Sequence, residues 1–261
     1  TLGYTYFGYG TGNTGSLLVQ NGGVVHMTSG QFISLGDDVN STGNLTVTGS
    51  GSTFNANYTI FSGNDTGATG NMIIENGGTL NGSSTVYVAG ANGGSTDNVT
   101  GTMIVRGSGT TVDLSGSSAS ISMGRGASGS ASLLIEDGAS VTTTDMTINQ
   151  SGIDSAATVR GSNTRLSITD DLFLGDTGGG EATLRVDQGA EVDIAGRMEL
   201  GGTSAEIVID GESSVLSTYE ITFYPGKQLT IQNGGMLVVD ESSPTFSGDF
   251  YFADGSIAIN D

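Results

Sequence analysis

Residues 17–25 read LLVQNGGVV, in which two short apolar runs flank an Asn-Gly-Gly turn. The same arrangement returns as MIIENGGTL at residues 72–80 and as LLIEDGASV at residues 133–141, and two further copies centre on Val186 and Ile231. Apolar runs this short, closely flanked by glycine, are typical of β-strands joined by tight turns and not of amphipathic helices. Their recurrence along the chain indicates a repeat protein.

A second kind of unit lies between these copies. It first occurs as LTVTGSGSTF at residues 45–54. The two kinds alternate, and the second has a turn that is one residue longer, because its next apolar residue comes seven positions after the central residue instead of six. We call the central residues anchors; they are Val19, Val47, Ile74, Val105, Ile135, Val159, Val186, Ile209 and Ile231.

A third apolar run follows in the units, and examples are Val86–Val88, Ile121–Met123, Leu172–Leu174, Met198–Leu200 and Phe250–Phe252. Three short strands per unit predict one triangular coil of a parallel β-helix, in which each strand pairs with its counterpart about 4.8 Å away. We therefore expect an all-β, right-handed parallel β-solenoid of about nine to ten coils. It should form a single repeat array over residues 1–261, cut from a longer chain.

The direction of each side chain follows from the two-residue period of a strand. The anchor and the residue two positions before it are predicted to point inward. The residue after the anchor should point outward, and the middle of this outward column alternates in charge as Glu75, Arg106, Glu136, Arg160 and Asp187. The sequence thus predicts a ladder of opposite charges on the surface, which would fix the order of the two coil types.

Composition excludes several classes of protein. The chain has 45 glycines, 2 prolines and no cysteine, so it forms no disulfide and no thiolate metal site. Its formal net charge of −20 argues against nucleic acid and anionic membranes as partners. The sequence has no apolar stretch long enough to insert into a membrane and no signal peptide, so an export signal is expected outside these residues.

The alternating units resemble the repeats of type V secretion and PEP-CTERM-associated proteins. The resemblance rests on a β run followed by N-G-G, D-G-A or G-S-G, and on closing phrases such as Val88-Ala89-Gly90 and Leu174-Gly175-Asp176. The units are also similar to the passenger regions of bacterial autotransporters, and the likeness covers nearly the whole chain. It implies export to the bacterial surface or the extracellular space, and adhesion to a glycan or protein of a host or cell surface. It supplies no catalytic residues, and the family's signal peptide and translocator barrel or sorting segment are missing here.

The two ends of the sequence predict an assembling unit as an alternative. Tyr4, Tyr6 and Phe7 resemble the third strand of a preceding coil. Apolar residues also recur near the other end, at Phe250, Tyr251, Phe252, Ile257 and Ile259. Because strand edges without a partner template further pairing, these residues are candidates for a head-to-tail interface between copies of the chain, which would build a filament.

No cofactor is predicted. Asp37, Asp38, Asn64 and Asp65 are the candidate ligands for a metal, since their oxygens suit Ca²⁺, but the chain contains no EF-hand loop and no Gly-Gly-x-Gly-x-Asp repeat.

The residues that could carry catalysis or bind sugars are acid pairs, one histidine and outward aromatic side chains. Three acid pairs lie at predicted turns: Asp37/Asp38, Asp170/Asp171 and Glu136/Asp137. Aspartate is common in turns because its side chain accepts hydrogen bonds from the backbone there. The single histidine, His26, has no partners for a catalytic triad. Outward aromatic residues at Tyr87, Phe173 and Tyr251 could stack on sugars, although Ser122, Thr147, Glu199 and Thr222 interrupt their column.

Three functions remain open at this point. The first is a non-enzymatic extracellular structural and adhesive protein, the second a self-assembling filament or matrix subunit, and the third a carbohydrate-binding or carbohydrate-active β-helix.

Overall fold

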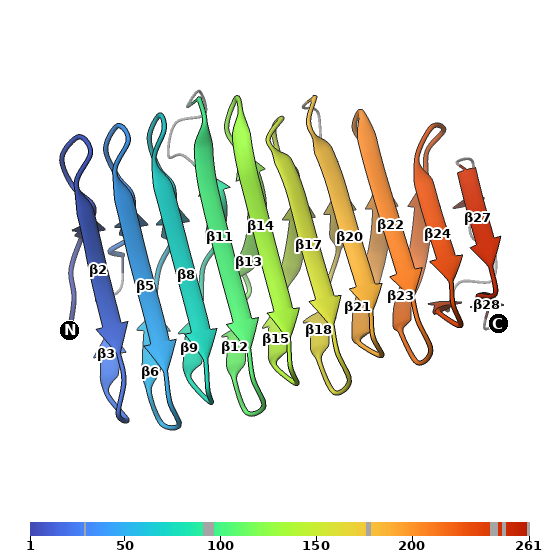
Figure 1. Ribbon diagram of the computed structural model, residues 1–261, viewed down its shortest axis with the longest axis horizontal. Coiled ribbons are helices and arrows are strands. Elements are labelled where there is room, and N and C mark those ends of the chain that lie inside the picture. The colour runs from blue at the N-terminus through green and yellow to red at the C-terminus, as the bar shows by residue number, and fades with distance from the viewer. Residues whose placement is uncertain (29, 91–96, 176–178, 241–244, 247–248, 260–261) are drawn as a thin grey trace.

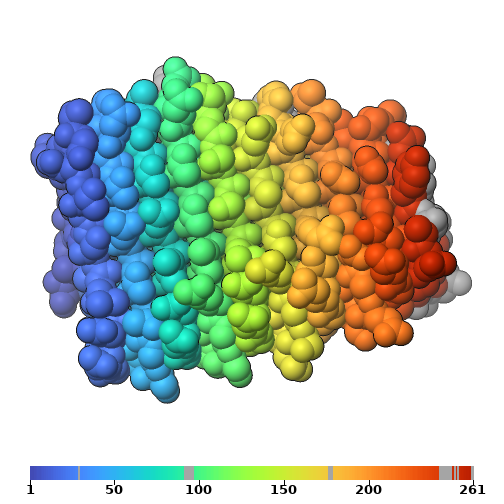
Figure 2. Space-filling view, in the orientation of Figure 1, coloured from blue at the N-terminus to red at the C-terminus, as the bar shows by residue number. Residues whose placement is uncertain are grey.

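The computed structural model describes residues 1–28, 30–90, 97–175, 179–240, 245–246 and 249–259. Within these residues the chain is a parallel β-solenoid, in which successive coils lie side by side along one axis from the N-terminal to the C-terminal end (Figure 1). The coils appear as bands across one broad face (Figure 2). The described residues include no helix that is long and apolar enough to cross a membrane.

The first wall of the solenoid is a ten-stranded parallel sheet that carries the anchors. Every anchor pairs with the next, from Val19 opposite Val47 to Ile209 opposite Ile231, as the sequence predicted. Its strands are β2 (Thr14–Val19), β5 (Thr42–Thr48), β8 (Thr69–Glu75), β11 (Val99–Arg106), β14 (Gly129–Glu136), β17 (Asp154–Arg160), β20 (Glu181–Asp187), β22 (Ser204–Asp210), β24 (Gln228–Gln232) and β27 (Asp249–Ala253).

The second wall follows the turn after each anchor. Its inward residues also form one column, in which Phe54 lies opposite Leu80 and Leu166 opposite Val192, although the turns differ in length by one residue. The extra residue is therefore absorbed within the turn. The strands are β3 (Val24–His26), β6 (Thr53–Ala56), β9 (Thr79–Gly82), β12 (Thr111–Leu114), β15 (Ser140–Thr143), β18 (Arg165–Ile168), the first halves of β21 (Glu191–Leu200) and β23 (Val215–Phe223), β25 (Met236–Val239) and β28 (Ser256–Ile259).

The third wall completes each coil. In β21 and β23 the second and third strands are continuous, so the second and third walls join into one hydrogen-bonded set of eighteen strands. The remaining strands of the third wall are β1 (Thr5–Phe7), β4 (Ile33–Leu35), β7 (Ile60–Ser62), β10 (Val86–Gly90), β13 (Ser120–Arg125), β16 (Asp145–Ile148), β19 (Leu172–Leu174) and β26 (Thr245–Phe246).

One strand assignment from the sequence was wrong. Phe250–Phe252 belongs to the first wall, where Phe250 lies opposite Leu229 and Phe252 opposite Ile231, and not to the third wall. The third-wall strand of that coil is Thr245–Phe246, which pairs with Thr222 and Phe223. Because an apolar alternation fits any wall of a solenoid, only the spacing from the preceding anchor distinguishes them.

The core is a continuous apolar column enclosed by the three walls. Anchors such as Val47, Ile74 and Val105 are fully buried, and so are the inward residues two positions before them, from Leu45 to Leu229. Leu17, in the first of these strands, is partly buried. Burial of apolar surface is the main favourable contribution to folding, so each coil is stabilised chiefly by stacking on its neighbours.

The corner between the third wall and the next first-wall strand requires glycine. A Cβ on Gly43 in β5 would lie 2.2 Å from the amide nitrogen of Gly36 and 2.4 Å from Cα of Leu35. Gly36 itself has a φ of 72°, which favours glycine. The backbone therefore passes too close at this corner for a side chain.

Candidate functional site

The outward charges of the first wall form separate pairs. Arg106 Nη2 lies 2.6 Å from Glu75 Oε2, and Arg160 Nη2 lies 2.5 Å from Glu136 Oε2. Each arginine also donates from Nε to the same oxygen, and these bonds raise the pKa of both guanidinium groups. Both arginines bind the carboxylate of the preceding coil, so the predicted ladder stacks in register but its ion pairs do not run on continuously.

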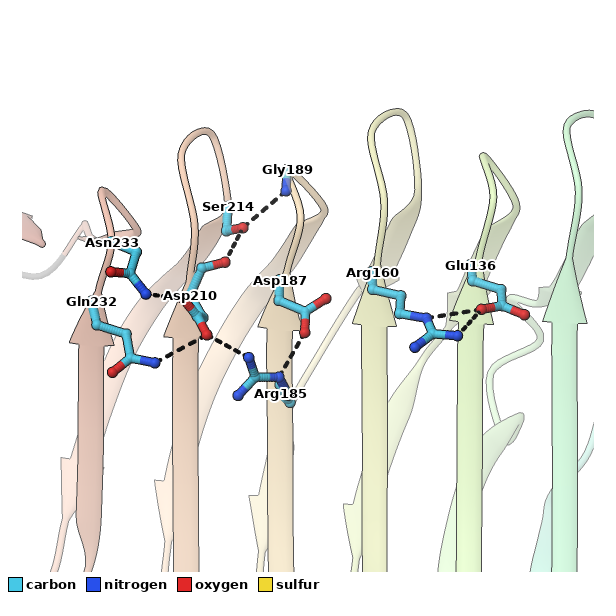
Figure 3. A network of polar contacts seen from close by, with 9 residues as sticks. All are labelled: Glu136, Arg160, Arg185, Asp187, Gly189, Asp210, Ser214, Gln232 and Asn233. Carbon is cyan, nitrogen blue, oxygen red and sulfur yellow. Dashed lines mark hydrogen bonds and ion pairs between the residues drawn. The ribbon is translucent and has the colours of Figure 1, made fainter.

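Asp187 departs from the predicted ladder. Its Oδ2 accepts from Nε of Arg185 on its own strand at 2.6 Å, and no ion pair joins it to Arg160 (Figure 3). Arg185 also bridges to Asp210 in the next coil. The pKa of Arg185 is raised first by its hydrogen bond to Asp187, while its own burial acts in the opposite direction. Arg185 was missed because it lies two positions before the outward column that the sequence singled out.

Asp210 is the centre of this polar network (Figure 3). It accepts from Nδ2 of Asn233 at 2.7 Å and from Nε2 of Gln232 at 3.0 Å, besides its bond to Arg185. These hydrogen bonds, led by the one from Asn233, lower the pKa of the Asp210 carboxyl. Its oxygens are therefore occupied by donors from neighbouring coils, which gives the network a structural role.

The four candidate metal ligands lie on equivalent corners of adjacent coils. Asn64 Nδ2 donates to Asp37 Oδ1 at 2.8 Å, and the backbone N–H of Gly10 donates to Asp38 Oδ2 at 2.6 Å. Asp65 Oδ1 accepts from the N–H of Thr66. Among the described residues there is no group of three or more histidine, cysteine or acidic side chains that could hold a metal. These oxygens accept hydrogen bonds within and between the turns.

The other titratable candidates also have structural partners. Asp171 Oδ1 accepts from the N–H of Arg197 at 2.7 Å, and Asp137 lies in a turn with a φ of 57°. His26 is exposed on β3, and its Nδ1 lies 3.2 Å from Nδ2 of Asn55. Asp171 also lies 3.9 Å from Nη2 of Arg197, and the described residues hold no cluster of three or more histidine, cysteine or acidic side chains.

An aromatic cluster covers the N-terminal part of the third wall. The rings of Phe61 and Tyr87 stack with centroids 5.1 Å apart and planes 3° apart, and the guanidinium carbon of Arg125 lies 5.0 Å from the centroid of Tyr87. Phe32 meets Phe61 edge-on at 5.7 Å. Tyr4 and Tyr6 also pack on Phe32. The stacked rings of Phe61 and Tyr87 cover each other's facing sides and pack one coil on the next, whereas Tyr4 and Tyr6 stay exposed.

The predicted column of outward third-wall residues through Tyr87 was incomplete toward the N-terminal end, and its interruptions toward the C-terminal end were correct. Phe61 extends it by one coil toward the N-terminus, where Ser34 takes the next position and Phe32 only packs beside it. Toward the C-terminus, the column is interrupted as expected, because its positions are filled in register by Ser122, Thr147, Glu199 and Thr222. Tyr251 does not belong to it, since it lies on the first wall opposite Thr230.

A groove crosses the third wall in the C-terminal half of the molecule. One hollow of about 320 Å³ is lined by Thr147, Gln150, Phe173, Gly175 and Glu199. A second hollow of about 410 Å³ shares Gly175 and Glu199 with the first and extends to Thr203, Tyr224 and Lys227. Both volumes lie in the range of small-ligand sites. We call this pair of hollows the third-wall groove; spacing in the sequence could not reveal it, because it depends on the size of side chains in four successive coils.

The candidate end-coil residues lie near the two ends of the stack. Tyr4, Tyr6, Tyr251 and Ile259 are exposed, and Phe7 and Ile257 are partly buried. The side chains of Phe250 and Phe252 lie outside the described residues. Head-to-tail contact between copies of the chain stays a prediction.

Comparison with known proteins yields distant structural similarity and no match in sequence. No family model matches the chain, and no curated protein matches it in sequence. Among solved structures it is similar to the crystal structure of a TibC-catalyzed hyper-glycosylated TibA55-350 fragment, with 18% sequence identity and a TM-score of 0.31. The alignment covers 98% of this chain and 97% of that one.

Proposed function

We propose that this chain is a non-enzymatic structural and adhesive element of the bacterial surface or extracellular space, built as a stiff right-handed β-helical rod. The observation that carries the proposal is the register of the first wall, which runs without a shift from β2 to β27. A stack of coils in register behaves as a quasi-one-dimensional rod. The right-handed sense follows from the strong preference of parallel crossovers for that hand.

The surface chemistry supports adhesion over catalysis. The first-wall carboxylates of Glu75 and Glu136 are held by arginines, and that of Asp210 also by side-chain amides. Asp171 accepts a hydrogen bond from a backbone N–H. What the rod presents instead is long faces with repeated polar groups and an aromatic cluster near one end. Many weak contacts along such a rod add to a strong attachment when the rod is anchored and its ligand is repeated.

The proposal is tested by coupling the chain to beads and measuring their retention on bacterial, epithelial and polysaccharide-coated surfaces under flow. Retention should be saturable, and it should fall when free chain is added as a competitor. Beads carrying a chain with the core substitution Val105→Asp, which destroys coil stacking, are the matched control. Retention equal to that of the control on every surface would contradict an adhesive role.

A further inference from the structure

The third-wall groove has the features of a ligand site built from four successive coils. Thr147 lies in β16, and Gln150 follows that strand. Phe173 lies in β19, Glu199 lies in β21, and Tyr224 follows β23. The two hollows share Gly175 and Glu199 in their lining, and the backbone of Gly175 lies too close to that of Gly201 to carry a side chain. The groove is thus elongated along the axis of the solenoid.

Lys227 provides a fixed cationic donor in the groove. Lys227 is only 6% exposed, and its Nζ donates a hydrogen bond to the backbone oxygen of Thr203 at 3.0 Å. An ammonium group has three donors, and within the described residues a hydrogen bond to Thr203 engages one of them, so two remain there for a ligand. Because burial holds this amine in place, its donors are pre-organised.

Gln150 and Glu199 add a donor and an acceptor of fixed orientation. Oε1 of Gln150 accepts from the hydroxyl of Ser122 at 2.6 Å, which leaves the amide N–H groups as its free end. Oε2 of Glu199 lies 3.2 Å from Nη2 of Arg197, which steadies the carboxylate at the junction of the two hollows. Donors and acceptors are thus interleaved along the groove, as a row of hydroxyl groups requires.

Aromatic rings lie toward the two ends of the groove. The guanidinium carbon of Arg197, from the next coil, lies over the ring of Phe173 at 5.5 Å from its centroid. Thr147, which pairs with Phe173 in the preceding coil, is too small to cover the other side of the ring. Tyr224 is 46% exposed. Unlike the stacked rings of Phe61 and Tyr87, neither of these two rings is stacked on another aromatic ring among the described residues.

The charge of the surrounding coils selects among ligands. Residues 136–261 contain 21 acidic and 5 basic residues, a net charge of −16, whereas residues 1–135 contain 6 acidic and 2 basic residues, a net charge of −4; together they give the total of −20. A polyanion approaching the groove therefore meets a repulsive field. A neutral ligand does not.

We propose that the third-wall groove binds a neutral oligosaccharide of hexose or N-acetylhexosamine units. The amide of Gln150 and the ammonium of Lys227 donate to sugar hydroxyls, Glu199 accepts from them, and Phe173 and Tyr224 pack against the apolar faces of the pyranose rings. This inference rests on the proposed adhesive function and names the chemistry of its ligand.

The test is titration calorimetry of the purified chain with cellohexaose, xylohexaose, chitohexaose, maltohexaose and mannohexaose, with hexagalacturonate as the acidic counterpart. At least one neutral hexamer should bind saturably, and hexagalacturonate should not. Tyr224→Ala and Gln150→Ala, at opposite ends of the groove, should each weaken that binding by about tenfold or more. Tyr219→Ala, which removes an exposed ring from β23, the strand that Tyr224 follows, but outside the groove, should change it by less than about twofold.

Thermal unfolding of each variant separates loss of a contact from loss of the fold. Absence of binding by every neutral hexamer would overturn the inference, and so would binding that both groove variants retain. If beads carrying Tyr224→Ala still adhere as well as the unaltered chain, the groove assignment fails while the adhesive function stands. If the neutral hexamer binds but beads fail to adhere to any surface, the adhesive function fails instead.

Discussion

The backbone N–H of Gly77 donates to Oγ1 of Thr110, one coil further along the axis, at 2.9 Å. The same relationship joins a turn glycine to a hydroxyl three more times, in the pairs Gly22–Ser52, Gly138–Thr164 and Gly189–Ser214. All four hydroxyl residues are at most 1% exposed. The shorter turn always provides the N–H and the longer turn the hydroxyl, so the alternation of the two coil types is an interlocking of their turns.

We predict that Thr110→Val destabilises the protein by about 1–3 kcal/mol, because it leaves the partly buried N–H of Gly77 without its acceptor. Thr110→Ser keeps the hydroxyl and should recover most of the loss. Hydrogen exchange at the amide of Gly77 together with urea unfolding measures both effects. Thr158→Val, on the outer face of β17, is the control, and an equal loss in this variant would show that the hydroxyl of Thr110 has no special role.

We predict that Gly43→Ala costs about 1–3 kcal/mol of stability, because the new Cβ would overlap the backbone of Gly36 and Leu35. Gly3→Ala is the matched control, since its Cβ would lie 3.8 Å from Oε1 of Gln31, an ordinary contact. Thermal unfolding of the two variants compares them directly. Equal melting temperatures would mean that the corner relaxes without cost.

The arginines of the first wall should differ in their contribution to stability. Arg160→Gln should cost at most about 1 kcal/mol, because the side chain of Arg160 is 44% exposed and its pair with Glu136 is screened by solvent. Arg185→Gln should cost more, since it leaves Asp187, which is 8% exposed, without its cation. Urea unfolding at low and high salt measures both, and a larger effect at Arg160 would contradict this order.

Asp210 should contribute stability that depends on pH. Its pKa is lowered in the folded protein, chiefly by the amide of Asn233, so its contribution is present above the pKa of the unfolded chain and is lost as the pH falls through the folded pKa. The stability difference between the unaltered chain and Asp210→Asn should thus be greatest near neutral pH and shrink on acidification below about pH 4. Urea unfolding across this range checks it, and a difference that stays constant with pH would contradict the assignment.

The register of the solenoid could be predicted from the sequence, whereas the detail of its surface could not. The anchors fixed which residues face inward because burial imposes a two-residue period on every coil. Which carboxylate pairs with Arg160 depends on side-chain rotamers, which the sequence period does not determine. Arg185 forms an ion pair within its own strand, and the repeat pattern does not predict this either. The third-wall groove depends on the small side chain of Thr147 beside the ring of Phe173, a difference in volume between coils that the apolar pattern does not record.

The most direct test of the central claim, that this rod holds its ligand without transforming it, is a measurement of polymer chain ends. The chain is incubated with each polysaccharide that retains the beads, and new reducing ends and unsaturated products are followed over many hours. We predict saturable binding with no increase in either product above the level without protein. A steady release of products that Glu199→Gln abolishes, with the fold intact, would contradict the claim and identify the groove as an active site.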